Sequence, residues 1–341
     1  MNSFKLENPD DLKNHLMDFY NVYMPVESVI NDVNWCALAN DNPVDYNPSL
    51  SSPTSSCKPF FFPEREDLFK FDGKKFVSTE YVGDKQALFG VHACDLMAIT
   101  YQDKFFKEDS YYQARRQRTL LVGIDCLTQC DQGFCHQVDS GPFVRPNTAD
   151  LILQPLDKTY QVWRLLVVTN YGLESIEGMN LEVDDKDGKN SRNEMQAEFV
   201  SHFKNYSYLD DGIKKINTQQ VSQNQWALLA KQCVTCSGCT QLCPTCSCYT
   251  TRDVFEGDNK NVKRERLWDS CLYEGFQKEA SGHNPTSQPG QRLEHFWYHK
   301  FSDSFVAQFD RYGCVGCGRC EQVCPGVIGV HSIMKRLSDY E

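Results

Sequence analysis

The chain has 341 residues, a formal net charge of −11 and 17 cysteines. The acidic balance argues against a nucleic-acid backbone as ligand, because phosphate binding depends on lysine and arginine. No stretch approaches the roughly twenty apolar residues that cross a bilayer, so we expect no direct membrane span. The first residues are polar without an apolar signal core, and an odd number of cysteines argues against a disulfide framework, so the expected location is the cytoplasm.

Residues 1–218 predict an N-terminal α/β domain. Asn8 followed by Pro9 is typical of a helix start. The apolar residues that follow share one helical face: Leu12, Leu16, Phe19 and Tyr20. Apolar runs over residues 87–91, 119–124 and 162–168 predict strands that alternate with helices.

A polar stretch around residues 175–220 separates this domain from a second one, since little in it could bury a core. The second domain, 219–341, opens with a helix that leads into Cys233, and we expect it to be mostly α-helical and ferredoxin-like. The segment between Cys243 and Cys314 is expected to contain extra helices and a turn near residues 281–290. The helical stripes in this domain comprise Trp226, Leu229 and Ala230, and Val330, Ile333, Met334 and Leu337. The predicted fold class is α+β.

The second domain carries one cysteine pattern twice. Both copies read C-x2-C-x2-C-x3-C-P, which is the ligand run of two-cluster bacterial ferredoxins. In that arrangement three thiolates of one run and the fourth of the other hold each 4Fe-4S cube. The spacing therefore predicts a first cluster on Cys233, Cys236, Cys239 and Cys324, and a second on Cys314, Cys317, Cys320 and Cys243.

Structural zinc is the main alternative for such cysteines. Zinc sites usually take two C-x2-C pairs separated by a longer spacer, and this chain has four cysteines in one short run. The doubled spacing favours iron-sulfur chemistry. A zinc-stapled binding module differs in colour, because iron-sulfur protein is brown.

Two predicted strands of the N-terminal domain end at cysteines. One leads to Cys94 and the other to Cys126, and Cys130 and Cys135 follow closely. Ligands of open α/β sheets bind beyond the strand ends, so these four residues could hold a third cluster. C-x3-C-x4-C is no standard signature, and buried structural cysteine is an equally weighted alternative.

Three further cysteines lie close to the first run in sequence or carry a distinctive context: Cys246, Cys248 and Cys271. Extra thiols of this kind more often line the cluster surroundings and tune the potential than take part in catalysis. Cys36 and Cys57 are expected to be inert. No dinucleotide-binding, P-loop or catalytic motif is present, so we assign no catalytic residue.

Taken together, these segments resemble one family, which includes the sulfhydrogenase beta subunit and its counterpart in anaerobic sulfite reductase. The segments that carry the resemblance are KPFFFP at 58–63, DLFKF at 67–71, GVHACDL at 90–96, DSYY at 109–112, GFC at 133–135, CPTCSC at 243–248, WDSC at 268–271 and both ferredoxin runs. Members of the family carry a cysteine where this chain has Gly133, and Cys130 is the available substitute.

The resemblance implies a cytoplasmic electron-transfer subunit that is not catalytic alone. It would relay electrons between a flavin- and NAD(P)-binding subunit and a catalytic partner, and would bind no flavin or NAD(P) itself. The implied partner is a nickel-iron hydrogenase with small and large subunits, or else a siroheme sulfite reductase subunit. It also favours a third 4Fe-4S cluster. The alternative is a heterodisulfide or polysulfide reductase subunit that uses Cys246, Cys248 or Cys271.

Overall fold

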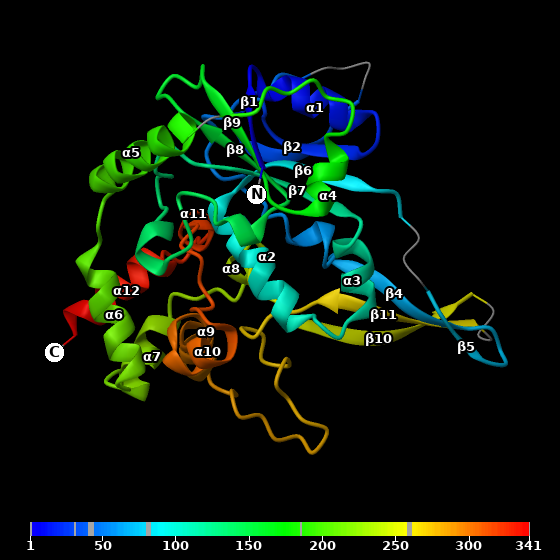
Figure 1. Cartoon of the computed structure of the whole chain (residues 1–341). Helices are drawn as coiled ribbons and strands as arrows, with labels where there is room; N and C mark the ends of the chain where they lie inside the picture. The colour runs from blue at the N-terminus through cyan, green and yellow to red at the C-terminus, as the bar shows by residue number, and fades with distance from the viewer. Residues whose placement is uncertain are drawn as a thin grey trace.

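The computed structural model describes residues 2–30, 32–39, 44–79, 83–184, 186–257 and 261–340. This part of the chain forms two sheets and a helical body (Figure 1). None of its helices combines the length and apolar character that a membrane crossing requires. The larger sheet has seven strands in the order β1-β9-β8-β7-β6-β2-β3. Their bounds are β1 Asn2–Leu6, β2 Asn21–Glu27, β3 Val33–Ala37, β6 Gln86–His92, β7 Thr119–Ile124, β8 Leu151–Pro155 and β9 Trp163–Val167.

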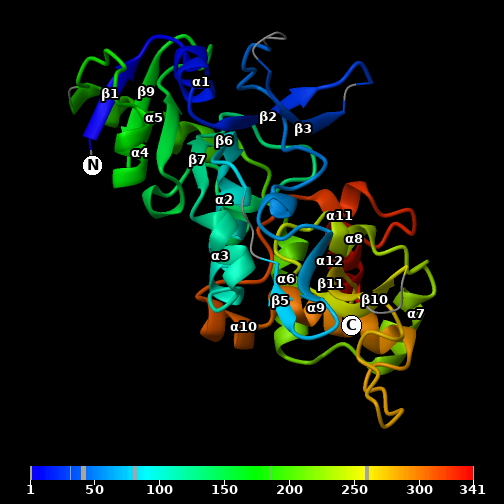
Figure 2. The same ribbon diagram turned by 90° about the vertical axis from the view of Figure 1, so that its right-hand side faces the viewer.

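The centre of this sheet is parallel and its edges are antiparallel. Strands β2, β6, β7 and β8 pair in parallel, whereas β3, β9 and β1 run against their neighbours. Parallel strands bury both faces, which helices must cover. Helices α1 (Pro9–Met17) and α4 (Asn170–Ser175) lie on one face, and α2 (Ala93–Phe105) and α3 (Ser110–Arg116) lie on the other (Figure 2). The α/β prediction for this part of the chain is confirmed.

The first helix begins where the sequence predicts. The Asn8 side chain accepts a hydrogen bond from the Asp10 amide, and Leu12 and Leu16 are fully buried. Phe19, which we expected on the same face, is 62% exposed. That expectation was wrong because α1 ends at Met17, so Phe19 lies beyond the helix and off its buried face.

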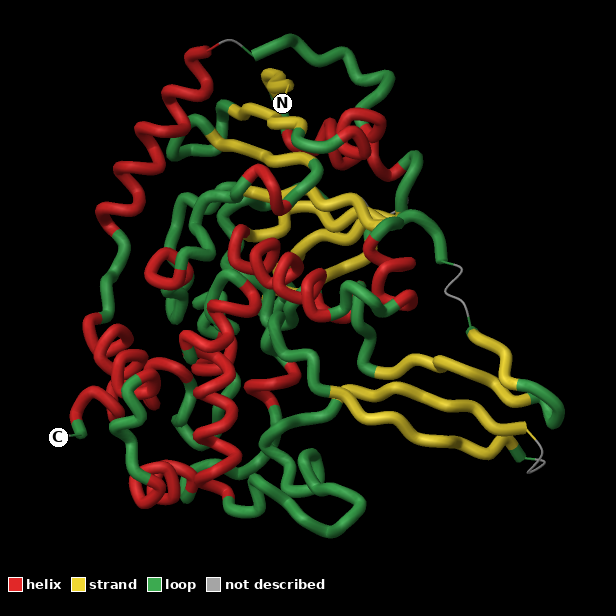
Figure 3. The backbone as a smooth tube through the Cα atoms, turned by 60° about the horizontal axis from the view of Figure 1, so that its bottom comes forward, coloured by secondary structure: helices red, strands yellow, loops and turns green. Residues whose placement is uncertain are grey.

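A second, four-stranded sheet projects from the molecule (Figure 3). All of its pairs are antiparallel, in the order β10-β11-β4-β5. The bounds are β4 Arg65–Phe71, β5 Phe76–Ser78, β10 Tyr249–Glu256 and β11 Asn261–Trp268. Strands from both halves of the chain therefore complete one sheet.

The hairpin β10–β11 lies where the sequence led us to expect only extra helices. That segment does contain helices α9 (Pro289–Phe301) and α10 (Asp303–Phe309), but the hairpin precedes them. Its charged residues find partners on β4: the Arg266 guanidinium donates to Glu66 Oε1 at 2.7 Å, and both side chains are buried. Pairing across 200 residues explains why local sequence did not reveal the strands.

The helical body surrounds a shared apolar core below the large sheet in Figure 1. Helix α12 packs on α6 and helix α7 packs on α9. Both predicted apolar stripes of the C-terminal domain are buried in this core, as expected. The bounds are α5 Lys186–His202, α6 Ser207–Asn217, α7 Gln223–Ala230, α8 Gly238–Gln241, α11 Arg319–Gln322 and α12 Val330–Asp339.

The polar stretch around 175–220 contributes more to the core than its composition indicates. Helix α6 buries Leu209 and Ile216 against α12, while Asp210 and Lys214 stay off the core. Amphipathic spacing explains this, because a few apolar residues on one face suffice when a partner helix covers them. A domain boundary at 218 stays a prediction.

Candidate metal centres

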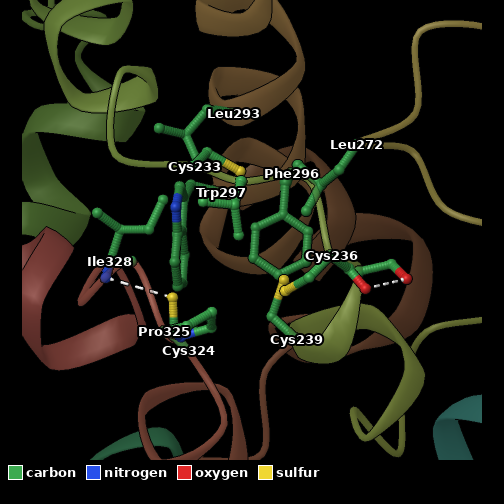
Figure 4. A pocket seen from close by; sticks show the side chains of 13 residues that line it. Cys233, Cys236, Cys239, Leu272, Leu293, Phe296, Trp297, Cys324, Pro325 and Ile328 are labelled. Carbon is green, nitrogen blue, oxygen red and sulfur yellow. Dashed lines mark hydrogen bonds between the residues drawn. The ribbon is translucent and has the colours of Figure 1, made fainter.

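The first predicted site is a cavity with four cysteines in its wall (Figure 4). Cys233 and Cys236 lie on the loop between α7 and α8, Cys239 lies within α8, and Cys324 follows α11. Cys324 thus joins the three cysteines of the other run, in the crosswise arrangement that the spacing predicts. The rest of the wall is mostly apolar and includes Leu272, Leu293, Phe296, Trp297 and Ile328.

Both cysteine runs share one backbone device. In the first run Thr235 and Ser237 have φ of 52° and 59°, and in the second the matching Gly316 and Gly318 have φ of 65° and 77°. Each run then enters a four-residue helix, α8 or α11. Left-handed residues alternating with right-handed ones turn successive amide N–H groups toward one side, which suits an anionic iron-sulfur group.

Amide hydrogen bonds to cysteine sulfur follow from this geometry. The Gly316 amide donates to Cys314 Sγ at 3.4 Å, and the Ile328 amide donates to Cys324 Sγ at 3.4 Å. Such N–H···S contacts orient the ligand sulfur and stabilise negative charge on it.

The second predicted site brings Cys243 to the three cysteines of the other run. Cys243 follows α8, and its thiol interacts electrostatically with Cys314, Cys317 and Cys320. Burial raises the pKa of Cys314 to about 12. Such thiols stay protonated at neutral pH until a metal displaces the proton, so this set suits a cationic metal centre.

Cys243 is the exception within this site. A hydrogen bond from the Cys246 thiol holds the pKa of Cys243 well below its usual range, and the Lys300 ammonium group adds to the effect. The protein alone therefore favours a thiolate at the position that links the two runs.

The four N-terminal cysteines also gather in space. Cys94 lies in the first turn of α2 directly after β6, and Cys126 lies just beyond β7. Cys126 interacts electrostatically with Cys130 and Cys135, and Cys94 interacts with Cys135. Burial raises the pKa of Cys135 to about 12, with Cys130 adding to the rise. The strand ends bring these thiols together, as the sequence led us to expect.

The N-terminal cysteine loop packs directly on the second ferredoxin run. The Phe134 amide donates to the Gly316 carbonyl at 2.8 Å. A Cβ atom at Gly318 would lie 2.3 Å from the Gln132 carbonyl oxygen, so only glycine fits there. Cys94 and Cys135 also pack with Cys317. The second site therefore lies between the other two groups of cysteines.

A buried ion pair fixes this contact. The guanidinium of Arg319 donates from both terminal nitrogens to the Asp95 carboxylate, at 2.7 Å each. Both side chains are at most 2% exposed. Arg319 lies between ligand candidates of the second run, and Asp95 follows Cys94. Sequence reasoning did not single out this pair, although both residues are adjacent to predicted ligands.

The donor set fits iron-sulfur cubes better than single metal ions. Within the described ranges, no three histidine, cysteine or acidic side chains converge as a mononuclear metal ion requires. A cube takes one thiolate on each iron, so its ligands surround a space and do not meet at a point. The cavity framed by Cys233, Cys236, Cys239 and Cys324 has that form.

Comparisons with known proteins agree with this donor set. The profile of the family described as "4Fe-4S dicluster domain" matches residues 232–328, which include all eight cysteines of the two runs. The protein named sulfhydrogenase 2 subunit beta of Pyrococcus furiosus is 31% identical over 294 residues, covering 84% of this chain and 82% of that protein. The chain belongs to the sulfhydrogenase beta subunit family. The suspected resemblance is confirmed, and a 4Fe-4S dicluster domain is part of this family member.

Gly133, where the family carries a cysteine, lies beside Cys130. The Gly133 amide donates to the Cys130 carbonyl at 2.9 Å, and a Cβ atom at Gly133 would lie 3.0 Å from Cys130 Cβ. A thiol at position 130 therefore starts from nearly the same point as a thiol at 133. This proximity favours Cys130 as the substitute in this sulfhydrogenase beta relative.

The three remaining thiols form a group between the two dicluster sites. Cys248 lies next to Cys271, whose thiol donates a hydrogen bond that lowers the pKa of Cys248 to about 7. The Cys246 thiol approaches Cys243. Cys246 and Cys271 are 8% and 4% exposed, so this group faces the interior.

Two buried lysines accompany these thiols, and no motif in the sequence indicated them. Lys300 Nζ donates to Cys243 Sγ at 3.3 Å and to Thr245 Oγ1 at 2.9 Å. Lys58 Nζ lies 3.8 Å from the centre of the Trp268 ring and donates to the Thr240 carbonyl. Lysine is almost never fully buried unless it is paired, so a cation in this place requires negative charge nearby.

Cys126→Ser is expected to remove about four irons and four sulfides per chain, because one corner of the N-terminal site loses its thiolate. Iron and acid-labile sulfide assays on anaerobically purified protein measure this loss. Cys36→Ser is the matched control, since Cys36 is an exposed thiol on β3. Unchanged iron content in Cys126→Ser would mean that the N-terminal cysteines are structural.

Proposed function

We propose that the chain is the iron-sulfur electron-transfer subunit of a cytoplasmic oxidoreductase complex. The observation that carries this proposal is the position of the fourth cysteine of each run, which lies with the three cysteines of the other run. Family membership adds support, because the Pyrococcus furiosus relative is named as one subunit of a sulfhydrogenase. The many reduced thiols support the cytoplasm, where disulfides are rare.

Two 4Fe-4S clusters are assigned to the crosswise sets, and a third to the N-terminal set. The first set is Cys233, Cys236, Cys239 and Cys324, the second is Cys314, Cys317, Cys320 and Cys243, and the third is Cys94, Cys126, Cys130 and Cys135. When bound, such clusters accept and donate single electrons. The residues of this chain hold the sites side by side and exclude water from them with apolar walls.

The partners that we propose are a flavin- and NAD(P)-binding subunit on one side and the small and large subunits of a nickel-iron hydrogenase on the other. A siroheme sulfite reductase subunit is the second candidate for the catalytic side. Flavin and dinucleotide are assigned to the partner and not to this chain, which therefore acts as a relay without a catalytic residue of its own.

Purification without oxygen from the native host tests this function. We expect about twelve irons per chain if all three sites are filled, and about eight if only the crosswise sets are. Partners identified in the same sample decide the complex: nickel and iron in a hydrogenase subunit support the first assignment, and siroheme supports the second. A colourless chain without iron, or a chain that turns over a physiological substrate alone, would contradict the proposal.

A thiol-active reductase subunit is the second candidate function. The hydrogen-bonded pair Cys248 and Cys271 favours it, because a thiol near its pKa at neutral pH is the nucleophile of disulfide exchange. Cys248→Ser and Cys271→Ser are expected to keep both iron content and most turnover in the assembled complex if the chain is a relay. Loss of turnover with full iron content would select the thiol reductase.

A further inference from the structure

The two dicluster sites differ in their nearby charge. The cavity wall at Cys233 and Cys324 contains apolar and small side chains and no lysine or arginine among the described residues that line it. The second site has an ammonium group at hydrogen-bond distance from Cys243 Sγ. Equal cysteine patterns are thus placed in unequal electrostatic surroundings.

Lys300 is held in this position by three hydrogen bonds. Its Nζ atom donates to Cys243 Sγ at 3.3 Å, to Thr245 Oγ1 at 2.9 Å and to the Gly313 carbonyl at 3.2 Å. An ammonium group has three donors, so its hydrogen-bonding capacity is filled. The residue is 5% exposed, and helix α9 fixes its backbone.

No acidic side chain in the described part of the chain forms an ion pair with Lys300. A buried charge without a countercharge is costly, and here only cysteine sulfur can supply the opposite charge. The Gly313 carbonyl and the Thr245 hydroxyl contribute dipoles but no net charge. The charge of Lys300 is therefore directed at the second site.

Other cations near the two sites do not remove this difference. Arg319 is compensated by Asp95. Arg311 donates to the Cys314 carbonyl at 3.4 Å and so adds positive charge on the side of the second site. Arg292 acts on Cys233, but its hydrogen bonds go to the carbonyls of Thr286 and Ser287 and not to a cysteine sulfur.

We propose that Lys300 is a positioning residue that raises the reduction potential of the second site above that of the first. This inference rests on the proposed iron-sulfur function. Uptake of one electron makes a site more negative by one charge, and a fixed cation in a low-dielectric interior stabilises that state. Net charge and hydrogen bonds to sulfur are the features that set such potentials. Because the second site lies between the other two, Lys300 would make the middle of the relay the preferred resting place of an electron.

The test is an anaerobic redox titration of the full-length protein, followed by electron paramagnetic resonance. The signal that disappears in Cys320→Ser identifies the second site. We expect Lys300→Met to shift the midpoint potential of that signal to a more negative value and to leave the first site unchanged. In the wild-type protein the second site is expected to have the more positive midpoint of the two.

Three variants separate charge from structure. Lys300→Gln keeps a hydrogen-bond donor near Cys243 Sγ without the charge, and we expect it to shift the midpoint as Lys300→Met does. Lys300→Arg keeps the charge and is expected to stay closer to wild type. Lys104→Met is the matched control, because Lys104 is half-exposed and donates to the Phe309 carbonyl, away from cysteine sulfur.

The outcomes are distinguishable from failure of the proposed function. A wild-type chain without iron would overturn the iron-sulfur assignment itself. An unmoved midpoint in Lys300→Met or Lys300→Gln, with full iron content, would overturn the role of Lys300 only. If Lys300→Met loses iron, Lys300→Gln is the variant that decides.

Discussion

Cys320→Ser is expected to lower the iron and sulfide content of the purified chain by about four each, since a serine hydroxyl then replaces one thiolate ligand of a cube. Cys320 lies in α11 and is close to Cys314 and Cys317. The crosswise assignment makes a further demand: the first site, with Cys324, should keep its iron. Metal analysis and the visible absorption spectrum measure both.

The exposed thiol variant Cys36→Ser is the control and should retain the full iron content. Cys243→Ser should resemble Cys320→Ser, because both residues are assigned to the second cluster although they come from different runs. If Cys243→Ser instead damaged the site of Cys233 and Cys239, each run would hold its own cluster and the exchange would be refuted.

Asp95→Asn is expected to destabilise the protein by about 3–5 kcal/mol, because it leaves the Arg319 guanidinium buried without a countercharge. The pair is completely internal and bidentate, so neither partner can turn to water. Denaturant unfolding of the anaerobic protein measures the change. We also expect the N-terminal cysteine loop to separate from the second run, since this pair joins α2 to α11.

Asp253→Asn is the matched control for that experiment. The pair Arg264–Asp253 joins β11 and β10 with both side chains about half-exposed, and surface pairs contribute about 0–1 kcal/mol. A similar loss of stability in the two variants would contradict the importance of burial for Asp95 and Arg319.

The sequence predicts the parts of this molecule that depend on short-range pattern. Spacing alone identified both ferredoxin runs, and continuous apolar runs identified β6 and β7. The helix starting after Asn8 was found from its cap and its proline. These features need information from only a few neighbouring residues, which explains why they are readable.

The features that the sequence did not reveal depend on distant partners. Arg266 is a plain basic residue until Glu66 and β4 are placed beside it. Lys300 looks like a surface lysine at the end of an amphipathic helix, and only the fold brings it to Cys243. Helix α6 has charged residues around its few apolar ones, so its composition concealed a core position for Leu209.

The projecting sheet has a consequence for biosynthesis. Glu66 leaves the ribosome 200 residues before Arg266, which corresponds to about 10–40 s at ordinary rates of synthesis. During this interval β4 has an open edge that faces no partner, and open edges promote aggregation. Yield in a foreign host should therefore depend on chaperones that shield this edge until translation ends, and a lower growth temperature alone should help less than added chaperone.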